Sequence, residues 1–320
     1  MSGTPARGIC SVVLVCVGAG ALCAAPLANA GELYRNQMNS SAGWGMNVTN
    51  ADVLATFGFN YGAIGIPEAP NSRGGDAATR GVKLEANTGE PAESAEMNLF
   101  PIGQSFSGDY RLRFDAWMSF DVTGGQIGST EFLGGGIGYD SATAGIGSGV
   151  QMIATGDGGS GSDWRAFKDS FFLTQDAMVA GSRNAADPYY TNFLPGVAPP
   201  VGSGQPAIAG FDGSPAFQWV TWQFTVYGDM VDIGIIKPNG DQRLIARIDV
   251  TDISDGSSGA TRDGNIMLYY GDIFTSVSPA PQFTFGLIDN VLVTTEIPAP
   301  GAIALLGVAS PIAVRRRRRR

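Results

Sequence analysis

The chain has 320 residues, of which 29 are acidic, 20 are basic and none is histidine. Seven of the basic residues are Arg7 and six arginines at the C-terminus, so the body between them holds 13 basic and 29 acidic residues and carries a net charge of −16. A surface of this sign repels nucleic acid, which we exclude as a partner. The absence of histidine also excludes catalytic triads and metal sites that need an imidazole.

The first 30 residues predict an export signal. Arg7 supplies a positive charge, residues 9–22 are mostly apolar, and Ala28-Asn29-Ala30 has the small residues of a cleavage site at Ala28 and Ala30. An uncleaved anchor is the alternative, but the apolar run is short for a span of about 20 residues. We therefore expect a signal peptide over 1–30, handled by the export machinery. All three cysteines lie within it, which predicts a mature protein without disulfides.

The body reads as a succession of β-strands. Residues 110–120 alternate between apolar and polar side chains over eleven positions, which is the period of a half-buried strand. Helical signals are limited to a short helix within 163–180 and a turn at 52–57. The expected strands are 81–86, 110–120, 131–139, 218–227, 230–236, 243–250, 266–270 and 283–295.

Residues 31–296 are long enough for one large β-sandwich or two small domains. Strands that follow one another without helices between them favour two packed antiparallel sheets. The Pro/Gly-rich stretch 184–214 has no periodicity, and we interpret it as a surface excursion over one edge of the sandwich. Because no internal repeat is visible, we expect a single domain.

The last expected strand contains Ile288-Asp289-Asn290-Val291. Together with the strand pattern over 84–293, it resembles the jelly-roll sandwiches of the concanavalin-like lectin and laminin-G type. That resemblance rests on pattern, and it implies that the first and last strands are neighbours. The expected fold is thus an all-β antiparallel sandwich, flanked by an N-terminal signal helix and a short C-terminal apolar helix.

The C-terminus, residues 297–320, has three parts: a proline turn, an apolar run over 302–314 and a block of arginines. It resembles the PEP-CTERM sorting signal, with Ala299 in place of the central glutamate of the Pro-Glu-Pro motif. The resemblance implies recognition by an exosortase-like membrane enzyme and a link to exopolysaccharide and the cell surface. The motif residues are Pro298, Ala299, Pro300, Arg315, Arg316, Arg317, Arg318, Arg319 and Arg320.

The apolar run is too short for a lasting membrane anchor. As a helix, residues 302–314 would measure about 20 Å, whereas the hydrocarbon core of a bilayer is about 30 Å thick. The arginines are expected to stay on the cytoplasmic side. We therefore expect a transient membrane segment, cleavage near Pro300, and a protein that ends at the cell surface or outside the cell.

Without histidine or cysteine, the catalytic groups that remain to be considered in the body are the carboxylates of Asp and Glu. A glycosidase needs only two of them at the right separation, but the Glu-x-Asp-x-(x)-Glu motif of jelly-roll glucanases is missing, and Glu93 and Glu96 have the wrong spacing. The run Gly134–Gly138 lacks the following helix and Lys-Ser/Thr of a nucleotide loop. Its glycines instead indicate a bulge or close sheet packing. We expect no enzymatic activity.

Three tryptophans are candidates for carbohydrate contact: Trp117, Trp219 and Trp222. Tryptophans of a β-sandwich more often belong to the core, so the core is the alternative for each. Trp222 shares the apolar face of its strand with Phe224, and Trp219 is therefore expected to point outward. An exposed aromatic ring on a sheet would mark a binding site.

Oxygen-rich loops at 157–160, 249–255 and 263–265 could supply the six to eight oxygen ligands that calcium needs. Asp289 is the candidate contributor from a strand, because jelly-roll modules often place an aspartate there. A structural calcium ion is thus one hypothesis, and no cofactor is the other.

Three functions remain open. The first is an exported, non-enzymatic β-sandwich that contacts extracellular polysaccharide. The second is a structural or adhesive surface protein without a small ligand. The third, a divergent polysaccharide hydrolase, would require two carboxylates about 5–10 Å apart in an open cleft.

Overall fold

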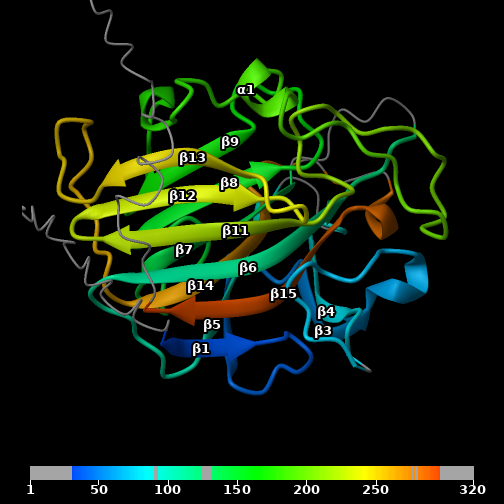
Figure 1. The fold of residues 1–320 in the computed structure, drawn as a ribbon, viewed down its shortest axis with the longest axis horizontal. Coiled ribbons are helices and arrows are strands. Elements are labelled where there is room, and N and C mark those ends of the chain that lie inside the picture. Colours follow the sequence, from blue (N-terminus) through cyan, green and yellow to red (C-terminus); the bar gives the residue numbers. More distant parts are fainter. Residues whose placement is uncertain are drawn as a thin grey trace, which may run out of the picture.

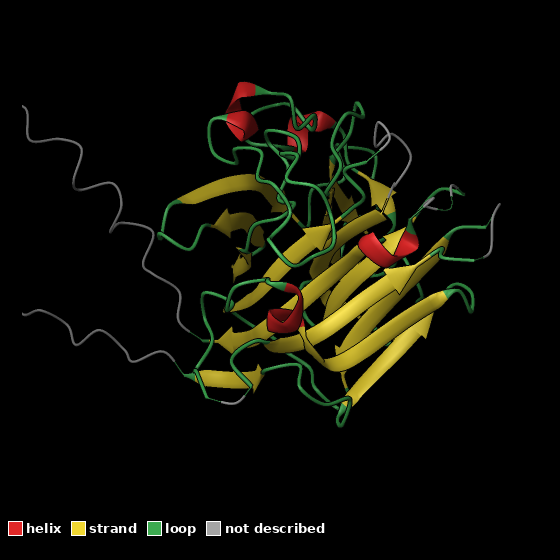
Figure 2. Ribbon diagram, turned by 90° about the vertical axis from the view of Figure 1, so that its right-hand side faces the viewer, coloured by secondary structure: helices red, strands yellow, loops and turns green. Residues whose placement is uncertain are grey.

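The computed structural model describes residues 31–75, 77–89, 93–123, 131–275, 277 and 280–295. The expected signal peptide with Ala28 and Ala30, and the sorting motif from Pro298 to Arg320, lie outside these residues. The described helices are short: α1 (Pro188–Thr191) and the 3-10 turns η1 (Tyr61–Ile64), η2 (Gln175–Ala177) and η3 (Pro281–Phe283). Figure 2 shows the helices outside the two sheets. None of them is long and apolar enough to cross a membrane.

Two antiparallel sheets form the body of the protein, as the strand pattern predicted. The first has the order β13-β12-β11-β6-β15-β4-β3, and β1 joins it by pairing with β15. In Figure 1 its strands β13, β12, β11 and β6 lie in front of β8 and β7 of the second sheet. The strands of the first sheet are β1 (Glu32–Asn36), β3 (Val53–Asn60), β4 (Arg80–Ala86), β6 (Tyr110–Ser119), β11 (Val220–Tyr227), β12 (Met230–Ile236), β13 (Gln242–Asp249) and β15 (Phe285–Thr294).

The second sheet has seven strands in the order β10-β9-β8-β7-β14-β5-β2. Its strands are β2 (Trp44–Val48), β5 (Ala95–Pro101), β7 (Glu131–Tyr139), β8 (Val150–Thr155), β9 (Trp164–Lys168), β10 (Phe171–Phe172) and β14 (Asn265–Asp272). The first expected strand, β4, pairs with the last strand, β15, which confirms that the two are neighbours, and the unexpected strand β1 pairs with β15 as well.

The core lies between the sheets, where alternate residues of each strand meet. Phe114 of β6 stacks on Trp222 of β11, with ring centroids 6.2 Å apart. Trp164, from β9 of the second sheet, reaches Trp222 with a centroid distance of 5.9 Å. The core is thus one apolar cluster shared by both sheets. Fully burying each such ring stabilises the fold by about 2–3 kcal/mol.

The glycines of β7 allow close packing, as the sequence suggested. A Cβ atom on Gly135 would lie 2.9 Å from Cε1 of Phe114 in the opposite sheet, and one on Gly134 would overlap the carbonyl oxygen of Met152 in β8. Both residues lie inside a paired strand rather than in a loop before a helix. The rejection of a nucleotide loop here is therefore confirmed.

Two local predictions are wrong. Residues 163–180 hold β9, β10 and η2 instead of an α-helix, because Trp164 and Ala166 alternate with Arg165 and Phe167 and pair with β8. Residues 52–57 belong to β3 rather than to a turn. The excursion 184–214 carries α1, and it is anchored to the core by the buried Tyr190, Phe193 and Leu194.

Candidate functional site

The outer face of the first sheet, turned away from the core, is covered by loop segments. On β6 this face carries Asp115, Trp117 and Ser119, because their neighbours Phe114 and Ala116 point into the core. Residues 61–71 follow β3 and lie over the middle of this face, and the 200–205 loop lies over one end of it. Between these two segments and residues 282–285 a small pocket remains, which we call the Trp117 pocket.

The Trp117 pocket has a volume of about 120 Å³ and a mixed lining. Its walls combine apolar ring faces with hydroxyl, amide and ammonium groups, which is the combination a saccharide requires. The aromatic residues are Phe59, Trp117, Phe283 and Phe285, and the polar ones are Lys83, Ser119, Ser203, Gln205 and Gln282.

Trp117 is the most informative residue of the lining. Its side chain is 3 % exposed, and its indole Nε1 is buried without a hydrogen-bond partner. A buried donor left unsatisfied costs about 1–3 kcal/mol. The ring is held on one side by Trp219, in an edge-on contact with a centroid distance of 5.7 Å. The indole N–H of Trp117 is thus a free donor on a residue that lines the pocket.

The other polar groups of the pocket are held in place by the protein. The Oε1 atom of Gln205 accepts a hydrogen bond from the backbone N–H of Val122 at 3.0 Å, and its Nε2 donates to Ser119 Oγ at 3.4 Å. Lys83 pairs with Glu85 at 2.7 Å, and its ammonium lies 4.8 Å from the centre of the Phe285 ring. The pocket therefore presents a preorganised set of donors and acceptors.

The structure places the three candidate tryptophans in different surroundings. Trp219 and Trp222 do lie on opposite faces of the sheet, but the expectation that Trp219 points into solvent is wrong. Its side chain is 3 % exposed, because Tyr61 packs on it at 5.2 Å and its Nε1 donates to the carbonyl of Pro67 at 2.8 Å. Trp222 is a core residue that is 1 % exposed. Of the three, Trp117 alone lines the pocket.

Two buried carboxylates hold the segment 61–71 that forms one wall of the pocket. Asp115 accepts hydrogen bonds from the side chain and backbone of Asn71, at 2.6 and 3.0 Å, and from Thr221 at 2.6 Å. Asp289, its cross-strand neighbour, accepts one from the hydroxyl of Tyr61 at 3.0 Å. Ile64 and Ile66, between these two anchor points, line the pocket.

Burial raises the pKa of both carboxylates. For Asp289, burial together with the charges of Asp115 and Glu68 raises the pKa to about 7. Burial also raises the pKa of Asp115, against the lowering effect of its hydrogen bonds from Thr221, Asn71 and Asn290. The two side chains are almost inaccessible to solvent. They therefore do not form the open carboxylate pair that a hydrolase needs.

The surroundings of Asp289 do not suit a calcium ion. Tyr61 donates its hydroxyl proton to Asp289, and the backbone N–H of Asn290 donates at 2.7 Å. The side-chain amide of Asn290 donates to Asp115 at 2.9 Å. These groups supply N–H and O–H donors, whereas calcium needs six to eight oxygen ligands. Among the described residues, no group of three or more acidic, histidine or cysteine side chains could hold a metal ion.

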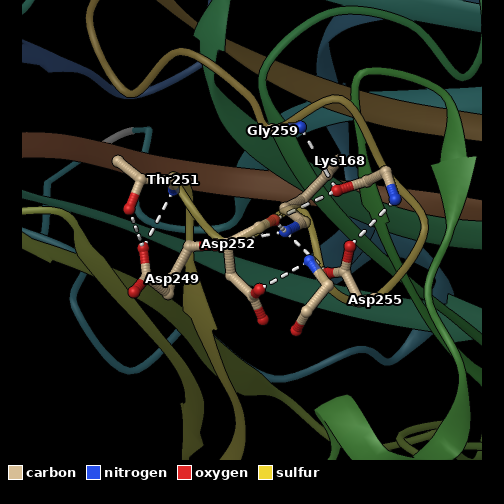
Figure 3. Close-up of polar contacts among 8 residues, drawn as sticks. Lys168, Asp249, Thr251, Asp252, Asp255 and Gly259 are labelled. Carbon is tan, nitrogen blue, oxygen red and sulfur yellow. Dashed lines mark hydrogen bonds and ion pairs between the residues drawn. The ribbon is translucent and has the colours of Figure 1, made fainter.

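A lysine occupies the centre of the oxygen-rich loop 249–255, as Figure 3 shows. The Nζ atom of Lys168, whose side chain is 1 % exposed, forms an ion pair with Asp255 at 2.6 Å. It also donates to the carbonyls of Asp249 and Asp252, at 3.2 and 2.5 Å. An ammonium thus takes the place in which the sequence suggested calcium, and the loop's own oxygens satisfy it.

In the other two oxygen-rich loops, 157–160 and 263–265, side chains also form hydrogen bonds within the protein. Asp157 accepts a hydrogen bond from the hydroxyl of Thr155, and burial raises its pKa to about 7, helped by the charges of Asp163 and Asp272. In the loop 263–265, Asp263 accepts a hydrogen bond from the backbone N–H of Gly108 at 3.3 Å, and Asn265 donates to the carbonyl of Pro101 at 2.8 Å. These contacts join neighbouring loops and strands, so a structural role accounts for both sites.

No protein-family model matches the sequence, and a comparison with curated proteins finds no match. Among solved structures, the Ca2+-bound exoplasmic/lumenal domain of VIP36 is similar with a TM-score of 0.42 and 7 % identity, over 82 % of this chain and 89 % of that one. The metal-free carbohydrate recognition domain of Emp46p is similar with a TM-score of 0.39 and 8 % identity, over 82 % of this chain and 93 % of that one. The legume lectin-like domain from Entamoeba histolytica is similar with a TM-score of 0.35 and 7 % identity, over 79 % of this chain and 89 % of that one. Identities and scores this low carry no argument about function.

Proposed function

We propose that this protein is an exported, non-enzymatic β-sandwich that binds a saccharide in the Trp117 pocket. The observation that carries the proposal is the buried, unpartnered indole N–H of Trp117 in the wall of a pocket lined by ring faces, amides and hydroxyls. A pyranose offers both matching surfaces: an apolar ring face for the aromatic side chains and hydroxyl groups for the donors and acceptors.

The pocket's size limits what it can hold. A single water needs roughly 10–15 Å³ of such a cavity, so about 120 Å³ has room for several waters. Pockets for drug-sized ligands are roughly 300–1,000 Å³. The ligand in this proposal is therefore one sugar unit, at the end or the edge of a longer chain.

A binding role is preferred to catalysis on chemical grounds. The sequence has no histidine, and its cysteines all lie in the expected signal peptide. The buried carboxylate pair, Asp115 and Asp289, is closed off beneath the segment 61–71 and is used to hold that segment. The polar groups in the pocket are amides, hydroxyls and an ammonium, which bind hydroxyls without activating a water molecule.

Export and sorting belong to the same proposal and rest on the sequence. The N-terminal 30 residues have the pattern of a signal peptide, and the C-terminus resembles an exosortase substrate. Mass spectrometry of the protein recovered from the cell surface or medium tests this. The proposal expects a protein that begins at Gly31 and ends near Pro300, and a protein that still ends in Arg320 would contradict it.

The binding proposal is tested by an array of neutral oligosaccharides, followed by calorimetric titration of any that bind. We expect binding of at least one of them by the purified protein, in the presence of a chelator as well as in its absence. A protein that binds no saccharide on the array would contradict the proposal and favour the structural or adhesive alternative.

A further inference from the structure

A cluster of arginine and phenylalanine side chains lies on the outer face of the second sheet, at its β9–β10 edge. The guanidinium carbon of Arg183 lies 4.4 Å from the centre of the Phe172 ring, and that of Arg165 lies 5.5 Å from the same ring. Arg165 also lies 4.8 Å from the centre of Phe132 and 5.4 Å from that of Phe274. Two cations thus share one aromatic ring.

The two arginines lack ion pairs with acidic side chains within the part of the chain that the structure describes. Arg165 donates through Nε to the carbonyl of Ser162 at 2.8 Å, and Arg183 donates through Nη1 to that of Leu173 at 3.1 Å. The Nε atom of Arg183 is buried without a partner. Burial lowers the pKa of Arg165, and the charge of Arg183 lowers it further, although Asp163 opposes this.

Asp163 does not neutralise the pair. Its two oxygens accept hydrogen bonds from the backbone N–H groups of Ser160 and Ala185, at 3.0 and 2.8 Å. Placing two guanidinium groups together has an electrostatic cost that an oxyanion between them would remove. This is notable in a body with a net charge of −16, where acidic side chains outnumber basic ones by 29 to 13.

Two of the three rings around the arginines are open to solvent, while Phe132 is buried. Phe172 is 37 % exposed and Phe274 is 44 % exposed. Exposed aromatic rings beside unpaired guanidinium groups offer a flat apolar surface and planar, charged donors at one place. A guanidinium matches a carboxylate in two parallel hydrogen bonds, and such charge-assisted bonds are roughly twice as strong as neutral ones.

We infer that Arg165 and Arg183 form a binding site for the carboxylate of an acidic saccharide, a uronate unit whose ring face packs on Phe172 or Phe274. The carboxylate supplies the ion pair that the acidic side chains of the described residues do not form with these arginines, and the sugar ring covers the exposed phenyl faces. The site is separate from the Trp117 pocket, because it lies on the outer face of the other sheet. Its existence does not depend on the proposed function of that pocket.

The test is a calorimetric titration of the purified protein with a galacturonate tetramer, a neutral tetrasaccharide and a sulfated tetrasaccharide. Arg165→Gln and Arg183→Gln each remove one cation of the site. Arg80→Gln is the matched control, since Arg80 is exposed, lies on the first sheet and changes the net charge by the same amount. Phe274→Ala removes an exposed ring without touching the charges, and Trp117→Phe alters only the other site.

We expect the galacturonate to bind and each arginine variant to weaken this binding about tenfold or more. Phe274→Ala should weaken it to a smaller extent, while Arg80→Gln and Trp117→Phe should leave it unchanged. Higher salt should weaken it in the unsubstituted protein. The inference is overturned if the galacturonate does not bind, or if it binds no better than the neutral sugar. It is also overturned if the sulfated sugar binds more tightly than the galacturonate. The same holds if Arg80→Gln weakens binding as much as the site variants do. Thermal melting of each variant separates loss of binding from loss of folding.

Discussion

Asp115 and Asp289 stand opposite each other on the neighbouring strands β6 and β15, and each holds one end of the same covering segment. Asp115 binds Asn71, and Asp289 binds Tyr61. The segment between these contacts covers Trp219 and supplies Ile64 and Ile66 to the Trp117 pocket. The two carboxylates are therefore positioning residues for the pocket wall.

Weakening either contact should loosen the wall. Asn71→Ala removes one side-chain hydrogen bond to the buried carboxylate of Asp115 and one to Thr221, and Tyr61→Phe removes one to the buried carboxylate of Asp289. Each should lower the free energy of unfolding by about 1–3 kcal/mol and speed amide hydrogen exchange within 61–71. Tyr227→Phe is the control, because its hydroxyl bonds Asp232 at 3.1 Å away from the pocket. Unchanged exchange within 61–71 in both variants would contradict this positioning role.

Stability should fall as the pH rises from about 5 to 8. Burial raises the pKa of both Asp289 and Asp157 to about 7, from an ordinary value of 3.8. The folded state therefore binds these protons more tightly than the unfolded state. The stabilisation that comes from protonating these two carboxyls is fully present below pH 4 and is lost as the pH rises through 7. In that range each group lowers the free energy of unfolding by up to about 1.4 kcal/mol per pH unit. Melting temperatures measured across this range check the trend.

Asp289→Asn and Asp157→Asn identify the groups responsible. Each variant removes one titrating carboxyl and keeps its shape, so each should flatten the dependence of the melting temperature on pH between 5 and 8. Asp232→Asn, at an exposed ion pair, should leave the slope in place. A slope that is the same in both site variants as in the unsubstituted protein would show that other groups cause it.

Lys168 should contribute more to stability than any exposed ion pair. Lys168→Met leaves Asp255 and two loop carbonyls without their buried ammonium, which should cost about 3 kcal/mol or more. Arg247→Gln, which breaks a pair whose arginine side chain is 54 % exposed, should cost less than about 1 kcal/mol. Urea denaturation of both variants measures the difference, and equal losses would contradict the central place of Lys168 in this loop.

The glycines of β7 should resist substitution. Gly134→Ala places a methyl group against the carbonyl oxygen of Met152 in the next strand, so a backbone shift is needed. The expected loss is about 3 kcal/mol. Gly161→Ala is the control, since a Cβ atom there meets nothing within 4 Å, and it should change stability by less than about 0.5 kcal/mol. Thermal or urea unfolding of the two variants measures these losses. A loss for Gly134→Ala as small as that for Gly161→Ala would contradict close packing at this strand.

The long alternating strands could be predicted because a period of two survives whenever one face is buried. All eight expected strands are present, with ends that differ by at most two residues. The strands β1, β2, β5 and β8 were missed because they are short, or because glycine, asparagine and glutamine interrupt their apolar pattern. Residues 163–180 were misassigned because β9 and β10 together offer only seven strand residues.

The candidate site was harder to predict, because its parts come from segments far apart in the sequence. Alternation correctly placed Trp219 on the face opposite Trp222, but it could not show that the segment 61–71 folds back over Trp219. Nothing in the sequence indicated that Asp115 is buried, since a solvated strand face would also carry a polar residue at that position. Lys168 was hidden in the segment expected to be helical. The loop that it fills was recognised from its oxygen-rich sequence.

The most direct test of the central claim compares Trp117→Phe with Trp44→Phe. Each substitution removes a buried indole N–H that has no partner, but only Trp117 lines the pocket. In calorimetric titrations with a neutral oligosaccharide that binds the unsubstituted protein, Trp117→Phe should weaken binding about tenfold and Trp44→Phe should leave it unchanged. Equal affinities for all three proteins would contradict saccharide binding in the Trp117 pocket.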